Sequence, residues 1–147
     1  MELKEFKRKI HKCFVEHGFE KIKNKYYRNG SEFLCMIDMY RSNFSASYIF
    51  DFYFFIGHFE KPYNINQESA PTYTPYVGGR FLFTDIEKCF CDYSIHDELK
   101  LKELLDKNFK DVILPPFNEG KRYLLKHFGT LYRTFLDVEM IKKKLES

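Results

Sequence analysis

The sequence has no apolar run that approaches the roughly 20 residues needed to cross a bilayer, although 44% of its 147 residues are hydrophobic. Its first residues, Met1–Glu5, include acids, and no apolar stretch follows them, so we expect no signal peptide. Without an export signal, the four cysteines are expected to be reduced thiols. These absences predict a cytoplasmic protein with no membrane partner.

The chain also lacks the motifs of common enzyme classes. It has no G-x-S-x-G nucleophile elbow, and Gly78-Gly79-Arg80 lacks the lysine and hydroxyl residue of a phosphate-binding loop. Cys13 belongs to the apolar stripe of a predicted helix, where burial suppresses thiolate reactivity. We therefore predict no catalytic residue, no cofactor and no enzymatic activity.

A structural zinc site is not predicted either. Cys89 and Cys91 are separated by one residue, and no second cysteine pair stands at matched spacing. His96 and His58 would have to complete the ligand set, and nothing in their spacing requires it. On a strand the two cysteines share one face, where a free thiol packs as a small apolar group. The prediction is no metal, and the sequence leaves the cysteine pair itself undecided.

Aromatic residues are abundant instead: 17 Phe and 11 Tyr, with no Trp. They concentrate in the segment Tyr48–Ile56, whose alternate residues are apolar on both sides apart from Asp51. Because a strand points successive side chains to opposite faces, both faces of this segment must be covered. We expect it near the middle of a sheet, with a helix layer on at least one face.

The rest of the chain predicts a single α+β domain over residues 1–147. Strands and helices are segregated along the sequence, which favours an antiparallel sheet with helices packed on it. We predict an N-terminal helix, a meander of about four strands and a C-terminal group of about three helices, with Pro115-Pro116 ending a helix. The predicted ranges are helix 3–17, strands 19–28, 32–40, 48–56 and 80–83, a capped turn at Thr84–Glu87, and helices 94–108, 119–128 and 131–145.

Residues 57–79 form a long loop in this prediction, because they show neither a strand nor a helix period. Loops of this length inside a domain are often functional. Tyrosine and arginine are common anchors of protein interfaces, so we predict a partner-binding site at Tyr63, Tyr73, Tyr76 and Arg80. The acidic balance of residues 31–100, with ten Asp/Glu against five Lys/Arg, favours a basic partner surface.

Two other functions stay open. Asp38 and Asp51 interrupt the apolar faces of adjacent predicted strands, and with His58 they would form an acidic cleft of a small hydrolase or ligand-binding enzyme if they shared a face. The third function is single-stranded nucleic-acid binding, because Gly79–Phe83 partly resembles the central strand of an RNA-recognition motif. The acidic middle of the chain opposes this function, since phosphate contacts dominate such affinity.

Several short segments resemble a known family. They are Gly18-Phe19-Glu20-Lys21, Asn24-Lys25-Tyr26-Tyr27-Arg28, Phe33-Leu34 and Phe55-Ile56-Gly57, with a looser likeness near Leu114-Pro115-Pro116. The chain resembles the small bacterial proteins grouped as domain of unknown function 4304. This resemblance implies a stand-alone bacterial α+β domain, and the family has no agreed catalytic residues to transfer. Many such orphan domains resemble immunity or accessory proteins of toxin and defence loci. We therefore predict a non-enzymatic protein-binding domain, in its concrete form an immunity-type protein that masks a toxin or defence protein.

Overall fold

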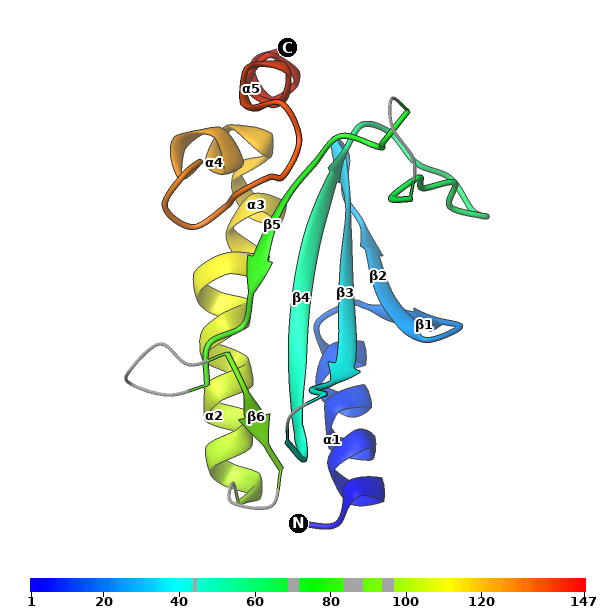
Figure 1. Cartoon of the computed structure of the whole chain (residues 1–147), viewed down its shortest axis with the longest axis vertical. Helices are drawn as coiled ribbons and strands as arrows, with labels where there is room; N and C mark the ends of the chain where they lie inside the picture. The colour runs from blue at the N-terminus through cyan, green and yellow to red at the C-terminus, as the bar shows by residue number, and fades with distance from the viewer. Residues whose placement is uncertain (44, 69–71, 84–88, 94–96) are drawn as a thin grey trace.

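The computed structural model describes residues 1–43, 45–68, 72–83, 89–93 and 97–147. It confirms the α+β fold: one helix precedes an antiparallel meander, and the other helices follow it (Figure 1). The helices are α1 (Leu3–Glu16), α2 (Glu98–Asn108), α3 (Leu114–Glu119), α4 (Lys121–Lys126) and α5 (Val138–Glu146). The strands are β1 (Glu20–Ile22), β2 (Lys25–Asn29), β3 (Phe33–Arg41), β4 (Ser47–Ile56), β5 (Tyr76–Arg80) and β6 (Cys91–Asp92). None of the described helices is long and apolar enough to cross a membrane.

The sheet has the strand order β1-β2-β3-β4-β5, and β6 pairs with the start of β4. β4 therefore lies between β3 and β5, inside the sheet, as its two apolar faces predict. The predicted strand 19–28 is in fact two strands, because the chain reverses at Lys23-Asn24 and pairs Ile22 with Lys25. Lys23 adopts a positive φ of 58°, the left-handed conformation that tight two-residue hairpin turns use.

The fourth long strand was predicted at residues 80–83, but β5 ends at Arg80. Gly78 and Gly79 lie inside this strand rather than closing a loop. The backbone of the neighbouring strand β4 comes very close to Gly78, which leaves no room for a side chain there. A Cβ atom on Gly78 would lie 2.2 Å from the carbonyl oxygen of Phe52. The backbone of Gly78 also exchanges two hydrogen bonds with Arg133, at 2.7 and 2.9 Å, so this edge of the sheet is covered.

One face of the sheet packs against α1 and α2 and forms the main core. Phe14 of α1 lies at its centre, with ring centroids 4.8 Å from Tyr26, 6.0 Å from Phe50 and 5.3 Å from Phe109. Edge-to-face contacts of this kind add stability beyond the area they bury. The aromatic residues thus fill an interior, and they join the helical layer to the sheet.

The C-terminal helices differ from the prediction in two places. Pro115-Pro116 does not end the helical path: α2 passes through a π-helical turn, Phe109–Ile113, into α3. The prolines stand in the first turn of α3, directly after the π-helical turn, in which the Leu114 N–H bonds the Phe109 carbonyl five residues earlier. The last helix begins at Val138, capped by the Asp137 carboxylate, and not at residue 131.

The apolar spacing of Leu131 and Phe135 caused this second error. In the structure Phe135 is 99% exposed, whereas the neighbouring Tyr132 is fully buried and donates a 2.8 Å hydrogen bond to the Val112 carbonyl. The pairing of Arg133 with Gly78 holds the segment in an extended form. The predicted turn at Thr84–Glu87 and the predicted start of a helix at residues 94–96 lie outside the described residues.

Candidate functional site: the open face of the sheet

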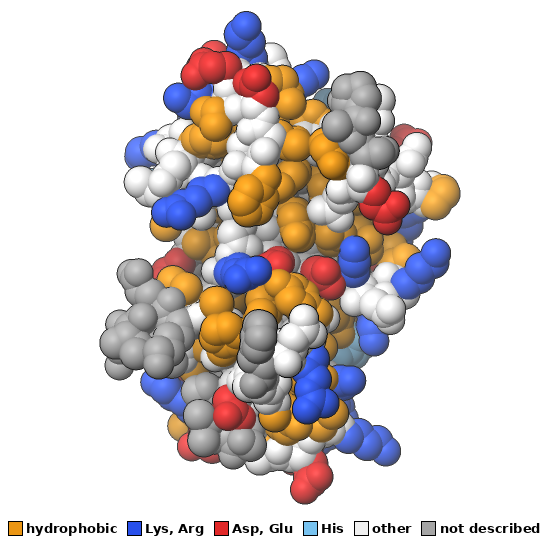
Figure 2. Space-filling view, in the orientation of Figure 1, with side chains coloured by type: hydrophobic (Ala, Val, Ile, Leu, Met, Phe, Trp, Pro, Cys, Tyr) orange, Lys and Arg blue, Asp and Glu red, His pale blue; other side chains and the backbone are white. Residues whose placement is uncertain are grey.

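The second face of the sheet carries a row of four charged residues. The strand register places Lys25 opposite Asp38, Asp38 opposite Asp51, and Asp51 opposite Arg80, so one residue from each of β2, β3, β4 and β5 lies in line. Residues directly opposite each other in an antiparallel pair point to the same face. Figure 2 shows acidic and basic side chains crossing the middle of this face between apolar areas.

Asp51 is held in a closed hydrogen-bonded triangle. Its carboxylate accepts 2.7 Å bonds from the Arg80 Nε and from the Tyr40 hydroxyl, and Arg80 Nη2 donates to the Tyr40 oxygen at 3.1 Å. Burial and the bond to Asp51 raise the pKa of Tyr40 to about 12. The Asp51 side chain is 15% exposed and that of Arg80 51%. The triangle therefore orients Arg80 on this face of the sheet while leaving about half of its side chain accessible.

Asp38 lies beside this triangle in a different state. It is half-buried, and among the described residues no hydrogen-bond donor reaches its carboxylate. Burial raises the pKa of Asp38 above its usual range, Lys25 opposes this effect, and the charge of Asp51 adds to it. Asp38 is thus an acceptor whose oxygens are open to a group that approaches from outside.

Tyrosines and an apolar cluster cover the adjoining half of the face. The buried side chains of Leu34, Met36 and Phe55 form a second, smaller core. Residues from the 57–75 segment and from the sheet pack around it: Tyr27, Tyr53, Phe59, Tyr63, Ile65 and Tyr76. The Tyr27 and Tyr63 rings lie 5.3 Å apart, and those of Tyr53 and Tyr76 lie 5.4 Å apart. The loop therefore covers one half of the face, and the charged row lies beside it.

The predicted partner-binding residues are partly brought together. Arg80 and Tyr76 both belong to β5 and face the same side, and Tyr63 packs on this side through Tyr27. Tyr63 therefore anchors the loop on the body of the domain. Tyr73 is half-buried, and no described ring contact joins it to the other three.

The predicted acidic cleft is also only partly assembled. Asp38 and Asp51 are directly paired across β3 and β4 and share a face, which the sequence left undecided. His58 is exposed beyond the end of β4, and the strand from Asp51 to Ile56 alone spans about 16 Å. His58 therefore does not converge with the two aspartates.

The two cysteines near β6 lie in different surroundings. Cys91 is buried, and burial raises the pKa of its thiol to about 12. Cys89 is half-buried, and His96, the histidine considered with this pair, lies outside the described residues. Only Cys91 belongs to β6, so the predicted strand face shared by the two cysteines is not formed, and the role of a small apolar group fits Cys91.

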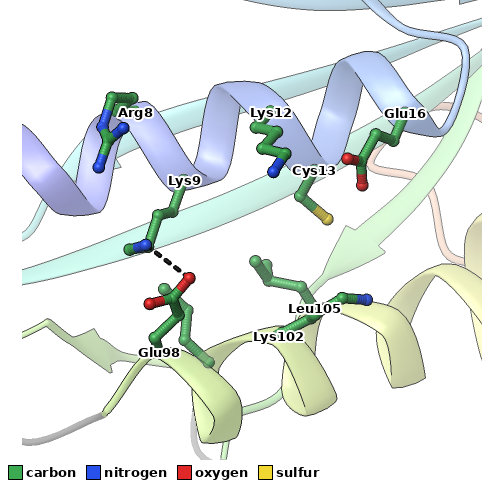
Figure 3. Close-up of a pocket in the computed structure, with 9 residues that line it drawn as sticks. Arg8, Lys9, Lys12, Cys13, Glu16, Glu98, Lys102 and Leu105 are labelled. Carbon is green, nitrogen blue, oxygen red and sulfur yellow. Dashed lines mark ion pairs between the residues drawn. The ribbon is translucent and has the colours of Figure 1, made fainter.

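Sequence reasoning missed Tyr40, which completes the triangle at Asp51. The available signal was strand parity: Tyr40 stands two residues after Asp38 on β3, and so shares its face. A second missed feature is a depression of about 250 Å³ between α1 and α2, lined by charged side chains (Figure 3). Lys9 of α1 and Glu98 of α2 form a 2.6 Å ion pair across it.

Comparison with known proteins gives one match. A protein-family model, Domain of unknown function (DUF4304), matches residues 10–119, which run from the middle of α1 to the end of α3. The matched region includes the whole sheet and the charged row. No curated protein and no solved structure matches the chain.

Proposed function

The chain belongs to the DUF4304 family, and we propose that it is a non-enzymatic, cytoplasmic protein-binding domain whose open sheet face receives a basic segment of a partner protein. The single observation that carries this proposal is the charged row, in which Asp38 is accessible and has no hydrogen-bond donor among the described residues, beside the fixed Asp51–Arg80–Tyr40 triangle.

The chemistry of Asp38 favours a cationic contact. A half-buried carboxylate without a donor is destabilising in the free protein, because burial penalises its charge. A lysine or arginine of a partner would supply both the opposite charge and hydrogen bonds. Truncating one member of such a buried charged pair typically costs 2–5 kcal/mol of affinity. We therefore expect Asp38 to contribute most of the specificity for the partner.

The surroundings of Asp38 supply the other part of the interface. Tyr53, Tyr76 and Arg80 are residue types that dominate binding energy at protein interfaces. Arg80 is already oriented by Asp51, so a partner carboxylate or carbonyl would meet it with little loss of side-chain freedom. The face thus offers an acidic contact, Asp38 on β3, and a basic contact, Arg80 on β5, with β4 between them.

An immunity-type role is the concrete form of the proposal. A domain that masks a toxin or defence protein needs a preformed rigid surface and no reactive group of its own. The sheet face meets the first need, since β3 and β4 pair over nine residues at this point. The product of the gene next to that of this protein is the partner to test first.

An acidic-cleft enzyme is supported less well. Paired carboxylates of opposite roles need one free acid and one free base, yet both oxygens of Asp51 are occupied by Arg80 and Tyr40. A depression on this side is lined by Ile22–Lys25, Tyr27 and Lys61–Tyr63, and neither aspartate contributes to it. We therefore keep binding as the proposed function.

The experiment measures the affinity for the adjacent gene product by isothermal titration calorimetry. We expect Asp38→Asn to weaken binding at least about tenfold, because it removes the charge with little change of shape. Arg80→Ala should weaken it by a similar factor. In cells, co-expression should protect growth against a toxic partner, and Asp38→Asn should reduce that protection.

Glu139→Gln on the exposed side of α5 is the matched control, because it removes the same charge far from the sheet face. Unchanged affinity in both Asp38→Asn and Arg80→Ala, with a partner that binds the wild type, would show that the open face is not the interface.

A further inference from the structure

Three ligand-type side chains meet between α1 and α2, away from the open sheet face. Cys13 and His17 stand four residues apart, so they lie on the same side of α1 at its C-terminal end. Asp106 approaches from the last turns of α2. Their sulfur, nitrogen and oxygen atoms all lie within 4.8 Å of one another. Figure 3 shows the Cys13 sulfur pointing into the space between the two helices.

The distances are close to those of a tetrahedral metal shell. His17 Nε2 and Asp106 Oδ1 are 3.4 Å apart, which is long for a hydrogen bond. In tetrahedral zinc coordination, with bonds of about 2.0–2.2 Å, a nitrogen and an oxygen ligand stand about 3.4 Å apart, and sulfur and nitrogen about 3.6 Å. Because the three ligand atoms lie within 4.8 Å of one another, a shift of about 1.2 Å at most would bring the Cys13 sulfur to that spacing.

Neighbouring groups hold two of the three ligands in orientation. The His17 ring stacks on Phe109, with centroids 4.1 Å apart and planes 14° apart. The other oxygen of Asp106 accepts a 2.7 Å bond from Lys102 Nζ, which leaves Oδ1 facing His17. Such outer contacts are what fix ligand direction in metal sites.

We propose that Cys13, His17 and Asp106 form a zinc-binding site that ties α1 to α2. Of the three ligands, Cys13 lines the depression of about 250 Å³ between the helices, from which the ion and a water molecule as fourth ligand would enter. This differs from the sequence prediction of no metal, which considered only the Cys89 and Cys91 pair. The signal in the sequence was the Cys-x-x-x-His spacing on one helix.

The proton balance of binding follows from the state of the thiol. Burial, together with the charge of Asp106, raises the pKa of Cys13 to about 12, so the metal-free side chain is protonated. Zinc binds thiolate sulfur, so the Cys13 S–H bond breaks, the S–Zn bond forms and one proton passes to the buffer. No electron is transferred in this step.

Charges around the site act in both directions. Lys12 and Lys102 line the depression, and their positive charges oppose the binding of a metal cation. Glu16 also lines it, and its negative charge favours that binding. Because the lysines are near, we expect weaker zinc binding than in a closed four-ligand structural site.

The test uses Co²⁺ and Zn²⁺ with the metal-free full chain under a non-chelating reductant. We expect one equivalent of Co²⁺ to give the visible bands of a tetrahedral site and a thiolate-to-cobalt charge-transfer band in the near ultraviolet. Zn²⁺ should displace both. Titration in two buffers of different ionisation enthalpy should show the release of about one proton.

Three single variants identify the ligands: Cys13→Ser, His17→Gln and Asp106→Asn. Cys13→Ser should abolish the charge-transfer band, and the other two should weaken Co²⁺ binding at least about tenfold while far-ultraviolet circular dichroism shows a folded protein. Cys89→Ser, the control, should retain the band. A band absent from the wild type, kept in Cys13→Ser, or lost in Cys89→Ser would overturn the site.

Discussion

Removing the hydroxyl of Tyr40 tests the hydrogen-bonded triangle on the open face with the smallest change of structure. Tyr40→Phe removes one oxygen and leaves the ring in place. Two hydrogen bonds are lost: the 2.7 Å bond to Asp51 Oδ2, and the weaker 3.1 Å bond that the hydroxyl accepts from Arg80 Nη2. A hydrogen bond to a charged group contributes about 1.5–3 kcal/mol.

We place the expected loss at the lower end of that range, about 1.5 kcal/mol, because Arg80 remains bound to the other oxygen of Asp51. For a chain of this size, 1 kcal/mol shifts the melting temperature by about 2–4 °C. Tyr40→Phe should therefore melt about 3–6 °C below the wild type at pH 7. Urea unfolding followed by circular dichroism measures the same free energy independently.

The difference should also shrink at high pH. Tyr40 titrates near 10 in the unfolded chain and near 12 in the folded protein. Between these values the folded state binds more protons, so wild-type stability falls as the pH rises from about 10 to about 12. The phenylalanine variant has no such group, and the two unfolding curves should therefore converge over this range.

Tyr53→Phe is the matched control at pH 7. Tyr53 lies on the same face, and among the described residues its hydroxyl makes no hydrogen bond. Its loss should change stability by less than about 0.5 kcal/mol. If Tyr40→Phe were as stable as Tyr53→Phe, the triangle around Asp51 would contribute nothing, and the argument for a fixed Arg80 would fail.

Three further predictions concern single residues. Asp38→Asn should stabilise the fold at pH 7, because folding raises the pKa of Asp38 and its charge is then unfavourable. The gain in stability should fall as the pH drops through that raised pKa, and it should vanish below the unfolded pKa of 3.8. Denaturant unfolding measures this gain, and a gain that is constant at all pH values would contradict the prediction. Gly78→Ala should cost about 3 kcal/mol or more, since its Cβ would lie 2.2 Å from the Phe52 oxygen, and an unchanged thermal midpoint would refute that close approach. Asn108→Ala should cost about 2–3 kcal/mol, because the buried amide of Asn108 bonds both backbone groups of Leu82; wild-type stability in urea would show these bonds to be dispensable.

The main elements of the architecture follow from local patterns. Tyr48–Ile56 alternates two apolar faces, which places it inside a sheet, and the helical spacing of Phe6, Ile10 and Phe14 gives the buried side of α1. Such patterns need only the neighbouring residues. The Gly78-Gly79 pair was misread because its place inside β5 depends on the close approach of Phe52, which is distant in the sequence.

The candidate site could be predicted only in part for the same reason. Asp38 and Asp51 were identified as interruptions of apolar strands, but whether they shared a face depended on the register between β3 and β4. That register is set by side-chain packing across the whole strand pair. The Asp106 ligand was inaccessible to sequence reasoning, since it is 89 residues from His17 and meets it only after α2 packs on α1.

The measurement that tests the central claim most directly is a double-mutant cycle between Asp38 and one basic residue of the bound partner. The affinities of the wild-type pair, the two single variants and the double variant give the coupling energy. With Asp38→Asn and the matching lysine or arginine changed to methionine, we predict a coupling of about 1.5 kcal/mol or more for one partner residue. A coupling near zero for every basic residue of a partner that binds the wild type would contradict the account.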